Sequence, residues 1–344
     1  MKAQPMPLNG PSALRPAAPR DWRKALESRE LILIAATVLA ALIAGAVNHD
    51  FLAGSNLRFM LLNSVVLGLV ALGQTLVIIT KGIDLSVAPV LGLAAVVSGL
   101  LATRQGLPLW GAVLLVLAMG AALGLINGAL VSSISIPPII VTLGTYSLYG
   151  GLIFLYSNGD QVNSVPDSYA HFGNGVLAPW FPVPIPILVL LVIMLGVWFL
   201  LGHLPFGRNI LAIGNNPAAA HHAGVPVKAT LTSAYVIAGT LAALAGLIYV
   251  CYTGSATATT GTGDHFELQS IATVLIGGTA VAGGRGSVFG TVLGSTFLSV
   301  ILTALVFLHV PAIWYSAGEG LMILLAVTSS SLRRSTGTGT GRAA

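Results

Sequence analysis

Residues Leu204–Lys228 read LPFGRNILAIGNNPAAAHHAGVPVK, a stretch of polar and small residues between two long apolar segments. Arg208 and Lys228 are two of the few charges in the middle of the chain. Of the 344 residues, 55% are hydrophobic and only 7% are charged, whereas soluble domains carry about 25% charged residues. The composition therefore predicts a polytopic membrane protein in which Leu204–Lys228 is a long loop at the membrane surface.

Ten segments are apolar enough to cross a bilayer, which takes about 20 residues of helix. The first, Leu31–Val47, does not alternate between apolar and polar residues, and this favours helices over the strands of a closed barrel. The polar leader before it is long for a signal peptide, so we expect an uncleaved helix. The predicted spans are Leu31–Val47, Phe59–Thr80, Val87–Thr103, Trp110–Ser132, Ile139–Ser157, Val183–Leu201, Ala229–Tyr252, Leu268–Ala282, Ser287–Leu308 and Pro311–Val327.

Basic residues fix the expected orientation, because they concentrate in cytoplasmic loops. With the N-terminus in the cytoplasm, alternation of ten spans leaves only Arg58 and Arg104 outside. We therefore expect a cytoplasmic tail at 1–30, a transmembrane domain at 31–327 with a cytoplasmic loop at 204–228, and a disordered cytoplasmic tail at 328–344. The cytoplasmic side receives Lys2, Arg15, Arg20, Arg23, Lys24, Arg29, Lys81, Arg208, Lys228, Arg285, Arg333, Arg334 and Arg342.

Ten spans divide into two halves of five. If the halves are related repeats, the odd number of spans in each gives them opposite orientations across the membrane, an inverted repeat. The third and eighth predicted spans then correspond. The third carries Pro89 and Gly92, the eighth carries Gly277 and Gly278, and both follow a loop with an acid. Short, Gly- or Pro-interrupted spans at matching positions are typical of a substrate pathway.

Glycines four residues apart predict close helix packing, which in lipid replaces the hydrophobic effect as the basis of association. This favours a structural role over substrate contact for Gly120, Gly124, Gly128, Gly286, Gly290 and Gly294.

Polar side chains at membrane depth are the candidates for a translocation pathway, because they face a bundle interior or an aqueous cavity. Amides can equally bridge helices, and both roles stay open. Glu319 is the one acid near the middle of a span, too few for a proton relay. With Asp84 in the loop before the third span, the candidates are Asn63, Gln74, Asp84, Asn127, Thr142, Thr145, Tyr146, Gln269 and Glu319.

Several kinds of chemistry have no motif in the chain. There is no Gly-x-x-x-x-Gly-Lys-Ser/Thr loop for ATP, and the single cysteine, Cys251, allows no internal disulfide. The adjacent His221 and His222 suit a shared metal poorly, so we expect no metal site and no catalytic residues. A transporter without an ATPase site needs a partner for energy, and the 204–228 loop is long enough to contact one. Asn216 and Pro217 predict the start of a second short helix there, which Gly224 would end.

Four stretches together resemble the membrane subunit of bacterial ATP-binding-cassette sugar importers, the ribose/xylose/galactose-type permeases of the branched-chain amino-acid permease superfamily. They are KGIDLSV (Lys81–Val87), PPIIVTLGTYSLYGGL (Pro137–Leu152), FGRNILAIGNNPAAAHHAGV (Phe206–Val225) and ELQSIATVLIGGTAVAGGRGSVFGTVLG (Glu267–Gly294).

The resemblance implies a fold, partners and a site. The fold is the ten-helix, type II-like importer fold with inverted repeats, in the bacterial inner membrane, working as a homodimer. A separate ATPase subunit binds ATP and Mg, this chain binds no cofactor, and a periplasmic or lipid-anchored binding protein delivers a monosaccharide. The ATPase contact falls on the loop residues Gly207, Arg208, Asn209, Gly214, Asn216, Ala219, Ala220 and Gly224.

The chain departs from the family pattern in two places. His221 and His222 follow the three alanines where an acid is more usual, and Ala88-Pro89 stands where Gly is usual. The outer loop Asn158–Pro182 has two open interpretations, an aromatic belt at the membrane interface or a docking surface for the binding protein. Alternatives for the whole chain are a permease for a polyol, autoinducer, nucleoside or amino acid, or a secondary carrier working alone.

Overall fold

The computed structural model describes residues 22–134, 136–178, 180–311, 313–315, 317–318, 320–321, 324 and 328. Eight helices in this part of the chain are long and apolar enough to cross a membrane. They are α1 (Trp22–Val47), α2 (Gly54–Ile79), α3 (Val87–Gln105), α4 (Leu109–Ser133), α5 (Pro138–Ser157), α7 (Ile185–His203), α10 (Val227–Thr253) and α12 (Val288–Phe307). The predicted span Pro311–Val327 and the tails at 1–21 and 329–344 lie wholly or largely outside the described residues.

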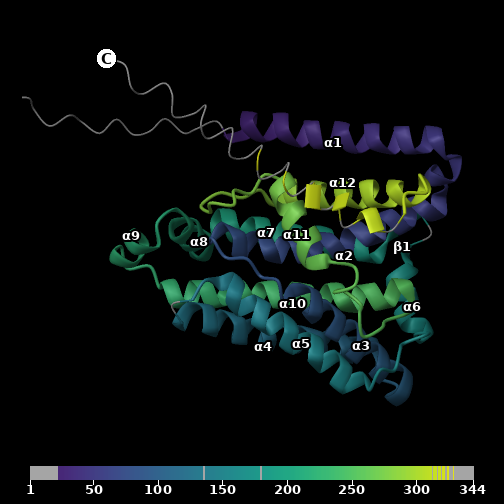
Figure 1. Ribbon diagram of the computed structural model, residues 1–344, viewed down its shortest axis with the longest axis horizontal. Helices are drawn as coiled ribbons and strands as arrows, with labels where there is room; N and C mark the ends of the chain where they lie inside the picture. Colours follow the sequence, from purple (N-terminus) through teal and green to yellow (C-terminus); the bar gives the residue numbers. More distant parts are fainter. Residues whose placement is uncertain are drawn as a thin grey trace, which may run out of the picture.

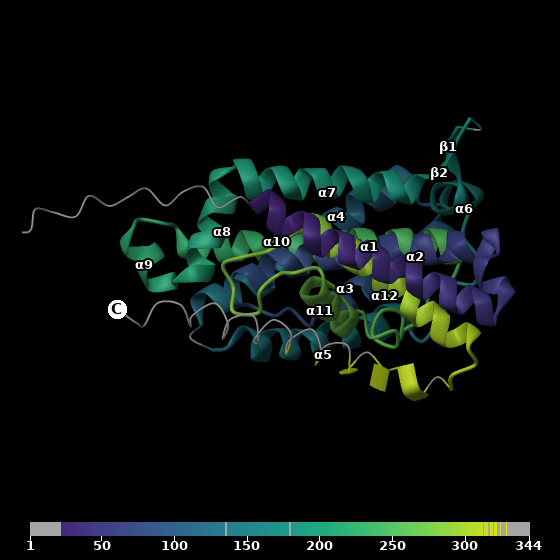
Figure 2. The same ribbon diagram turned by 90° about the horizontal axis from the view of Figure 1, so that it is seen from above.

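Shorter elements occupy the two ends of the bundle. α8 (Pro205–Asn215) and α9 (Pro217–His222) lie at one end, and the helix α6 (Asp167–Asn174) lies at the other with the strand β1 (Val176–Ala178), as Figure 1 shows. β1 pairs antiparallel with β2 (Phe181–Pro184), and a 3-10 turn, η1 (His49–Leu52), links α1 to α2. The long helices run side by side between these ends (Figures 1 and 2).

The eighth predicted span is a half-length helix, α11 (Phe266–Ile276). Its 11 residues span about 16 Å at 1.5 Å per residue, so it cannot cross the hydrocarbon core alone. It ends at Gly277, and Gly278 has a φ of +106°, which glycine adopts without strain. The expectation of a short, glycine-interrupted eighth span is confirmed.

The third predicted span is not interrupted, and this expectation is wrong. α3 runs unbroken for 19 residues from Val87, through Pro89 and Gly92. Pro89 is the third residue of the helix, where a backbone N–H would have no intrahelical acceptor, so its ring costs no hydrogen bond. Gly92 lets the backbone of Thr260 approach α3 closely, since a Cβ at position 92 would collide with the Thr260 carbonyl.

Two helices, α2 and α10, form the centre of the bundle and pack against each other. α10 also packs on α4 and α3, and α2 packs in the same way on α12 and α11. In the predicted inverted repeat, α2 corresponds to α10, α3 to α11 and α4 to α12. The central helix of each half therefore packs on the two equivalent helices of the other half. The outer helices break the pattern, because α1 packs on α12 whereas α7 packs mainly on α2.

The α4–α10 contact is made backbone to backbone. A Cβ on Gly120 would collide with the carbonyl of Gly239, and a Cβ on Gly239 would collide with the carbonyl of Gly120. One turn further along, Gly124 faces the carbonyl of Tyr235 in the same way. Apolar side chains gain little by leaving lipid for one another, so this close approach supplies the dispersion contacts that hold the two helices together.

Replacing Gly120 with alanine should lower the free energy of unfolding by about 1–3 kcal/mol, the usual cost of overpacking. Thermal unfolding of the detergent-purified chain measures the change. Gly196→Ala in α7 is the control, because an added Cβ there meets nothing within 4 Å. That variant should be neutral or up to about 1 kcal/mol more stable, since alanine favours helix. Equal stability of the two variants would contradict the close contact.

Candidate functional site

The polar stretch 204–228 forms two short helices, as the sequence predicts. α8 ends at Asn215, and Asn216 caps α9 by accepting hydrogen bonds from the backbone N–H groups of Ala218 and Ala219, both at 3.1 Å. Pro217 opens α9 with a fixed φ that suits the first helical position. Gly224, with a φ of +80°, ends it.

The residues that the sequence assigns to an ATPase contact divide into two groups. An exposed group points away from the bundle and is free to meet a partner, and a buried group rests on the bundle. Exposed or half-exposed are Arg208, Asn209, Asn216, Ala219 and Gly224, whereas Gly207, Gly214 and Ala220 are buried. His221 and His222 lie with the exposed group, their ring centroids 6.1 Å apart.

Gly214 lies where three segments of the chain meet. A Cβ there would collide with the carbonyl of Ile79 at the end of α2 and with the backbone N–H of Gly284. The Gly284 N–H also donates to the Ile79 carbonyl at 2.9 Å, and the Lys81 Nζ donates to the Asn215 carbonyl at 3.2 Å. The exposed face of α8 and α9 is thus joined rigidly to α2 and to the segment that connects α11 with α12.

A second polar cluster forms around the loop between α2 and α3. Lys81, with a φ of +68°, turns the chain back into the bundle, and Asp84 is buried. The Asp84 carboxylate accepts from the backbone N–H and the hydroxyl of Ser86, at 2.9 and 2.7 Å. Burial raises the pKa of the Asp84 carboxyl to about 6, and these two bonds act in the opposite direction.

Side chains from three helices complete this cluster. Asn127 of α4 donates to the Ser86 hydroxyl at 2.6 Å, and Thr142 of α5 donates to the Ile83 carbonyl at 3.0 Å. With its amide turned to suit its neighbours, Gln74 of α2 bonds both backbone groups of Asp84, at 3.2 and 3.3 Å. Four predicted pathway residues, Gln74, Asp84, Asn127 and Thr142, thus meet at this loop, where each bonds the backbone or the Ser86 side chain of residues 83–86.

The other predicted pathway residues lie apart from this cluster. Thr145 donates to the backbone carbonyl of Thr142 at 3.2 Å, and Tyr146 is half-buried on α5. Asn63 and Gln269 lie together at a separate hollow toward the α6 end of the bundle. Glu319 lies outside the described residues.

Ser86 and Tyr149 also bond at the Asp84–Asn127 cluster, but neither is among the pathway residues predicted from the sequence. Ser86 bridges Asp84 and Asn127, and the Tyr149 hydroxyl donates to the Leu123 carbonyl at 3.0 Å. Ser86 stands two residues after Asp84, the spacing of an Asx turn, so that signal was present.

The predicted packing glycines lie at close helix contacts. Gly120, Gly124 and Gly128 of α4 face α10. Gly290 and Gly294 of α12 face the backbone of Gly277 and Thr273, at the end of α11. Gly286 precedes α12 and lies against the Ile79 side chain.

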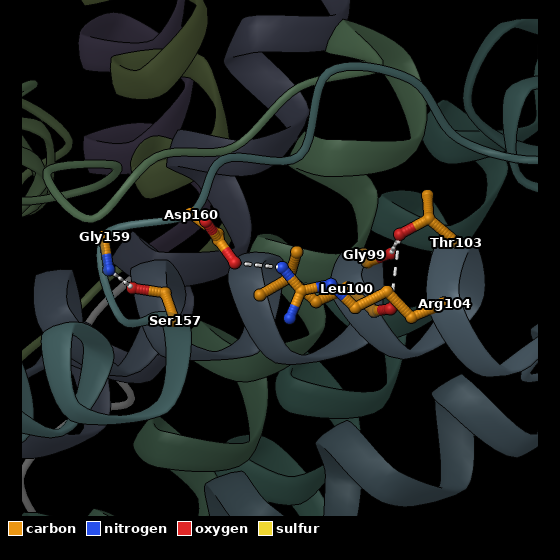
Figure 3. A network of polar contacts seen from close by, with 7 residues as sticks. All are labelled: Gly99, Leu100, Thr103, Arg104, Ser157, Gly159 and Asp160. Atoms are coloured by element: carbon orange, nitrogen blue, oxygen red, sulfur yellow. Dashed lines mark hydrogen bonds and ion pairs between the residues drawn. The ribbon is translucent and has the colours of Figure 1, made fainter.

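An ion pair joins α3 and α5 at the α6 end of the bundle. Arg104 in the last turn of α3 bonds Asp160, which follows α5 (Figure 3). Ser157 accepts from the N–H of Gly159 at 3.1 Å and shapes the turn that presents Asp160. Both charged side chains are more than half exposed, so the pair adds little to stability and serves mainly to fix the loop.

Among the described residues, no group of three or more His, Cys, Asp or Glu side chains is arranged to hold a metal ion. Cys251 is buried within α10.

Residues 56–327 match the family described as "Branched-chain amino acid transport system / permease component". The chain therefore belongs to this family of inner-membrane permeases, and it is a multi-pass permease component of an ATP-binding-cassette importer.

Its relatives cover nearly the whole chain. It is 36% identical over 299 residues to the autoinducer 2 import system permease protein LsrC of Enterobacter sp. strain 638, covering 87% of this chain and 85% of that protein. It is 35% identical over 314 residues to the ribose import permease protein RbsC of Escherichia coli K12, covering 90% of this chain and 95% of that protein. No solved structure matches the chain significantly.

Replacing Ser86 with alanine should cost about 1–3 kcal/mol of stability, because it leaves the buried Asn127 amide and the Asp84 carboxylate each short of a hydrogen bond. Ser98→Ala in α3 is the matched control. Ser98 is also buried, but its hydroxyl bonds only carbonyls of its own helix. Thermal unfolding in detergent compares the two, and a loss no larger for Ser86→Ala than for Ser98→Ala would argue against the cluster as an anchor.

Proposed function

We propose that the chain carries a monosaccharide, or a solute of similar chemistry, into the cell and is energised by a separate ATPase that docks on α8 and α9. The observation that carries this proposal is the exposed surface of α8 and α9, which is joined through Gly214 to the end of α2. A partner that moves this surface also moves a central helix of the bundle.

The solute class is supported by the relatives, one of which is a ribose and the other an autoinducer 2 import permease. Both names favour a small sugar-like compound over a branched-chain amino acid. The alternative solutes are a polyol, an autoinducer, a nucleoside or an amino acid. The nearly equal identity to the two relatives, 36% and 35%, favours the autoinducer among these.

The proposed orientation has both termini in the cytoplasm. It puts Lys81, Arg208, Lys228 and Arg285 on the cytoplasmic side, and Arg104 outside with the Asp160 loop. Basic residues concentrate on the cytoplasmic side of membrane proteins, and the arrangement of elements in Figure 1 supports this division, because α8 and α9 lie opposite α6 and β1.

Three partners follow from this proposal. The first is the ATPase, which binds ATP and Mg, because the sequence of this chain has no phosphate-binding loop of its own. A loaded binding protein docks at the outer end, where the α6 region exposes Leu177 and Trp180. A second copy of the chain pairs through α5, which exposes an apolar face that includes Ile140, Leu143 and Leu155. Nucleotide and loaded binding protein then each bias one end of a two-state bundle.

Reconstitution with the ATPase and a binding protein tests the proposal. ATP hydrolysis should rise several-fold when ribose-loaded binding protein is added, because both ligands favour the same state of the bundle. Empty binding protein is the control. Gradient-driven ribose uptake by the chain alone, without an ATPase, would show instead that it is a secondary carrier.

Reversing the charge of Arg208 should abolish most ATP-driven uptake while the chain still inserts, because an exposed cation at the docking surface becomes an anion. Arg208→Lys is the matched variant and should keep most of the uptake. Co-purification of the ATPase reports docking directly. Normal uptake and normal co-purification by Arg208→Glu would place the docking surface elsewhere.

A further inference from the structure

A hollow of about 480 Å³ opens between α2, α10, α11 and α12. It lies toward the start of α2 and the end of α10, so it is at the opposite end of the bundle from α8 and α9. In the proposed orientation this is the outer half of the membrane. The volume falls in the range of about 300–1,000 Å³ that is typical of small-molecule sites.

Several polar groups at this hollow have no hydrogen-bond partner within the described part of the chain, and three of them belong to α2 and α10. They are the amide of Asn63 on α2 and the hydroxyls of Tyr249 and Tyr252 on α10, all of which line the hollow. An amide or hydroxyl without a partner at membrane depth is costly. These groups therefore face water or a solute that can hydrogen-bond to them.

Aromatic rings form the apolar wall of the same hollow. Tyr249 contacts Tyr252 edge to face, with ring centroids 5.7 Å apart, and it contacts Phe266 of α11 at 6.3 Å. Phe59 of α2 continues the series, 6.1 Å from Tyr252. Rings that brace one another in this way stay in place and present fixed faces and hydroxyls.

An acid and an amide complete the lining. Asp264 precedes α11, and its backbone carbonyl accepts a hydrogen bond from the Gln269 side chain at 2.7 Å. The hollow thus holds a carboxylate, amides and three phenols, of Tyr249, Tyr252 and Tyr315, beside apolar ring faces. A polyhydroxylated solute suits this lining, because each hydroxyl can donate and accept and its C–H faces can lie on the rings. An aliphatic amino acid would leave most of these polar groups unpaired.

We propose that this hollow is a solute-binding subsite within a single copy of the chain, and that Asn63, Tyr249 and Tyr252 bind the hydroxyl groups of a pentose-sized solute there. This inference rests on the proposed function for its solute class. It also places Asn63 and Gln269 in a role separate from the Gln74–Asp84–Asn127 cluster, whose side chains have protein partners, with Ser86 linking Asp84 to Asn127.

Cysteine labelling tests the subsite without requiring transport. Thr253→Cys, at a half-exposed residue that lines the hollow but is not proposed to bind the solute, is made in a Cys251→Ala background. The full chain in right-side-out membrane vesicles is treated with a charged, membrane-impermeant thiol reagent. We expect labelling from outside, slowed at least threefold by D-ribose and unaffected by L-leucine. Ser98→Cys is the control and should stay unlabelled, because Ser98 is fully buried.

Three outcomes would overturn the subsite. They are no labelling of Thr253→Cys above the Ser98→Cys level, labelling that ribose does not slow, and protection by L-leucine in place of ribose. Because no ATPase takes part, ribose protection without ATP-driven import would uphold the subsite and reject the proposed function. Import without protection would do the reverse.

Tyr249→Phe gives a second measurement that removes only one hydroxyl. Loss of one hydrogen bond should raise the KM for ribose in ATP-driven uptake by about 3–10-fold, with Vmax nearly unchanged. Tyr149→Phe is the matched control, since the Tyr149 hydroxyl donates to the Leu123 carbonyl inside the bundle. This variant should leave the KM for ribose unchanged. An unchanged KM in Tyr249→Phe would contradict the assignment.

Discussion

Close backbone contact between α4 and α10 is the constraint on which the rest of the structure depends. Gly120 and Gly239 face each other so closely that neither has room for a Cβ. In lipid, burying apolar side chains gives little net gain, so helices associate where small residues let their backbones approach. α10 also packs on α2 and α3, and this contact therefore fixes the framework against which the buried loop and the half-helix are placed.

The same framework connects the two ends of the molecule. The carbonyl of Ile79 ends α2 against Gly214 and Gly284. Two residues further on, Lys81 turns the chain into the bundle toward the Asp84–Ser86–Asn127 cluster. At the other end of α2, Asn63 lines the hollow. One helix thus touches the α8–α9 surface proposed to dock the ATPase, the buried cluster and the hollow. This contact is the physical basis for the proposed coupling between the two faces of the membrane.

Particular elements show how far sequence patterns go. The Asn216–Pro217 start and the Gly224 end of α9 were predictable, since capping depends on residues within one turn. The half-length α11 was predictable from Gly277 and Gly278. The unbroken α3 was also open to prediction, because the predicted span begins at Val87, as α3 does, and this puts Pro89 in the first turn, where proline costs no hydrogen bond. The interruption was inferred from residue type without regard to position in the helix.

The sequence by itself determined the class of protein, because a 55% hydrophobic, 7% charged chain can place its side chains only in lipid or against one another. Its local motifs also marked the α8–α9 surface and the close-packing glycines. The tertiary structure alone decided which polar residues meet. Gln74, Asp84 and Asn127 come from segments up to 53 positions apart and are joined in one hydrogen-bonded cluster through Ser86 and the Asp84 backbone. Asn63, Tyr249 and Tyr252 instead share a hollow. Hydrogen bonding at membrane depth depends on which helices adjoin, and that is fixed by packing across the whole bundle.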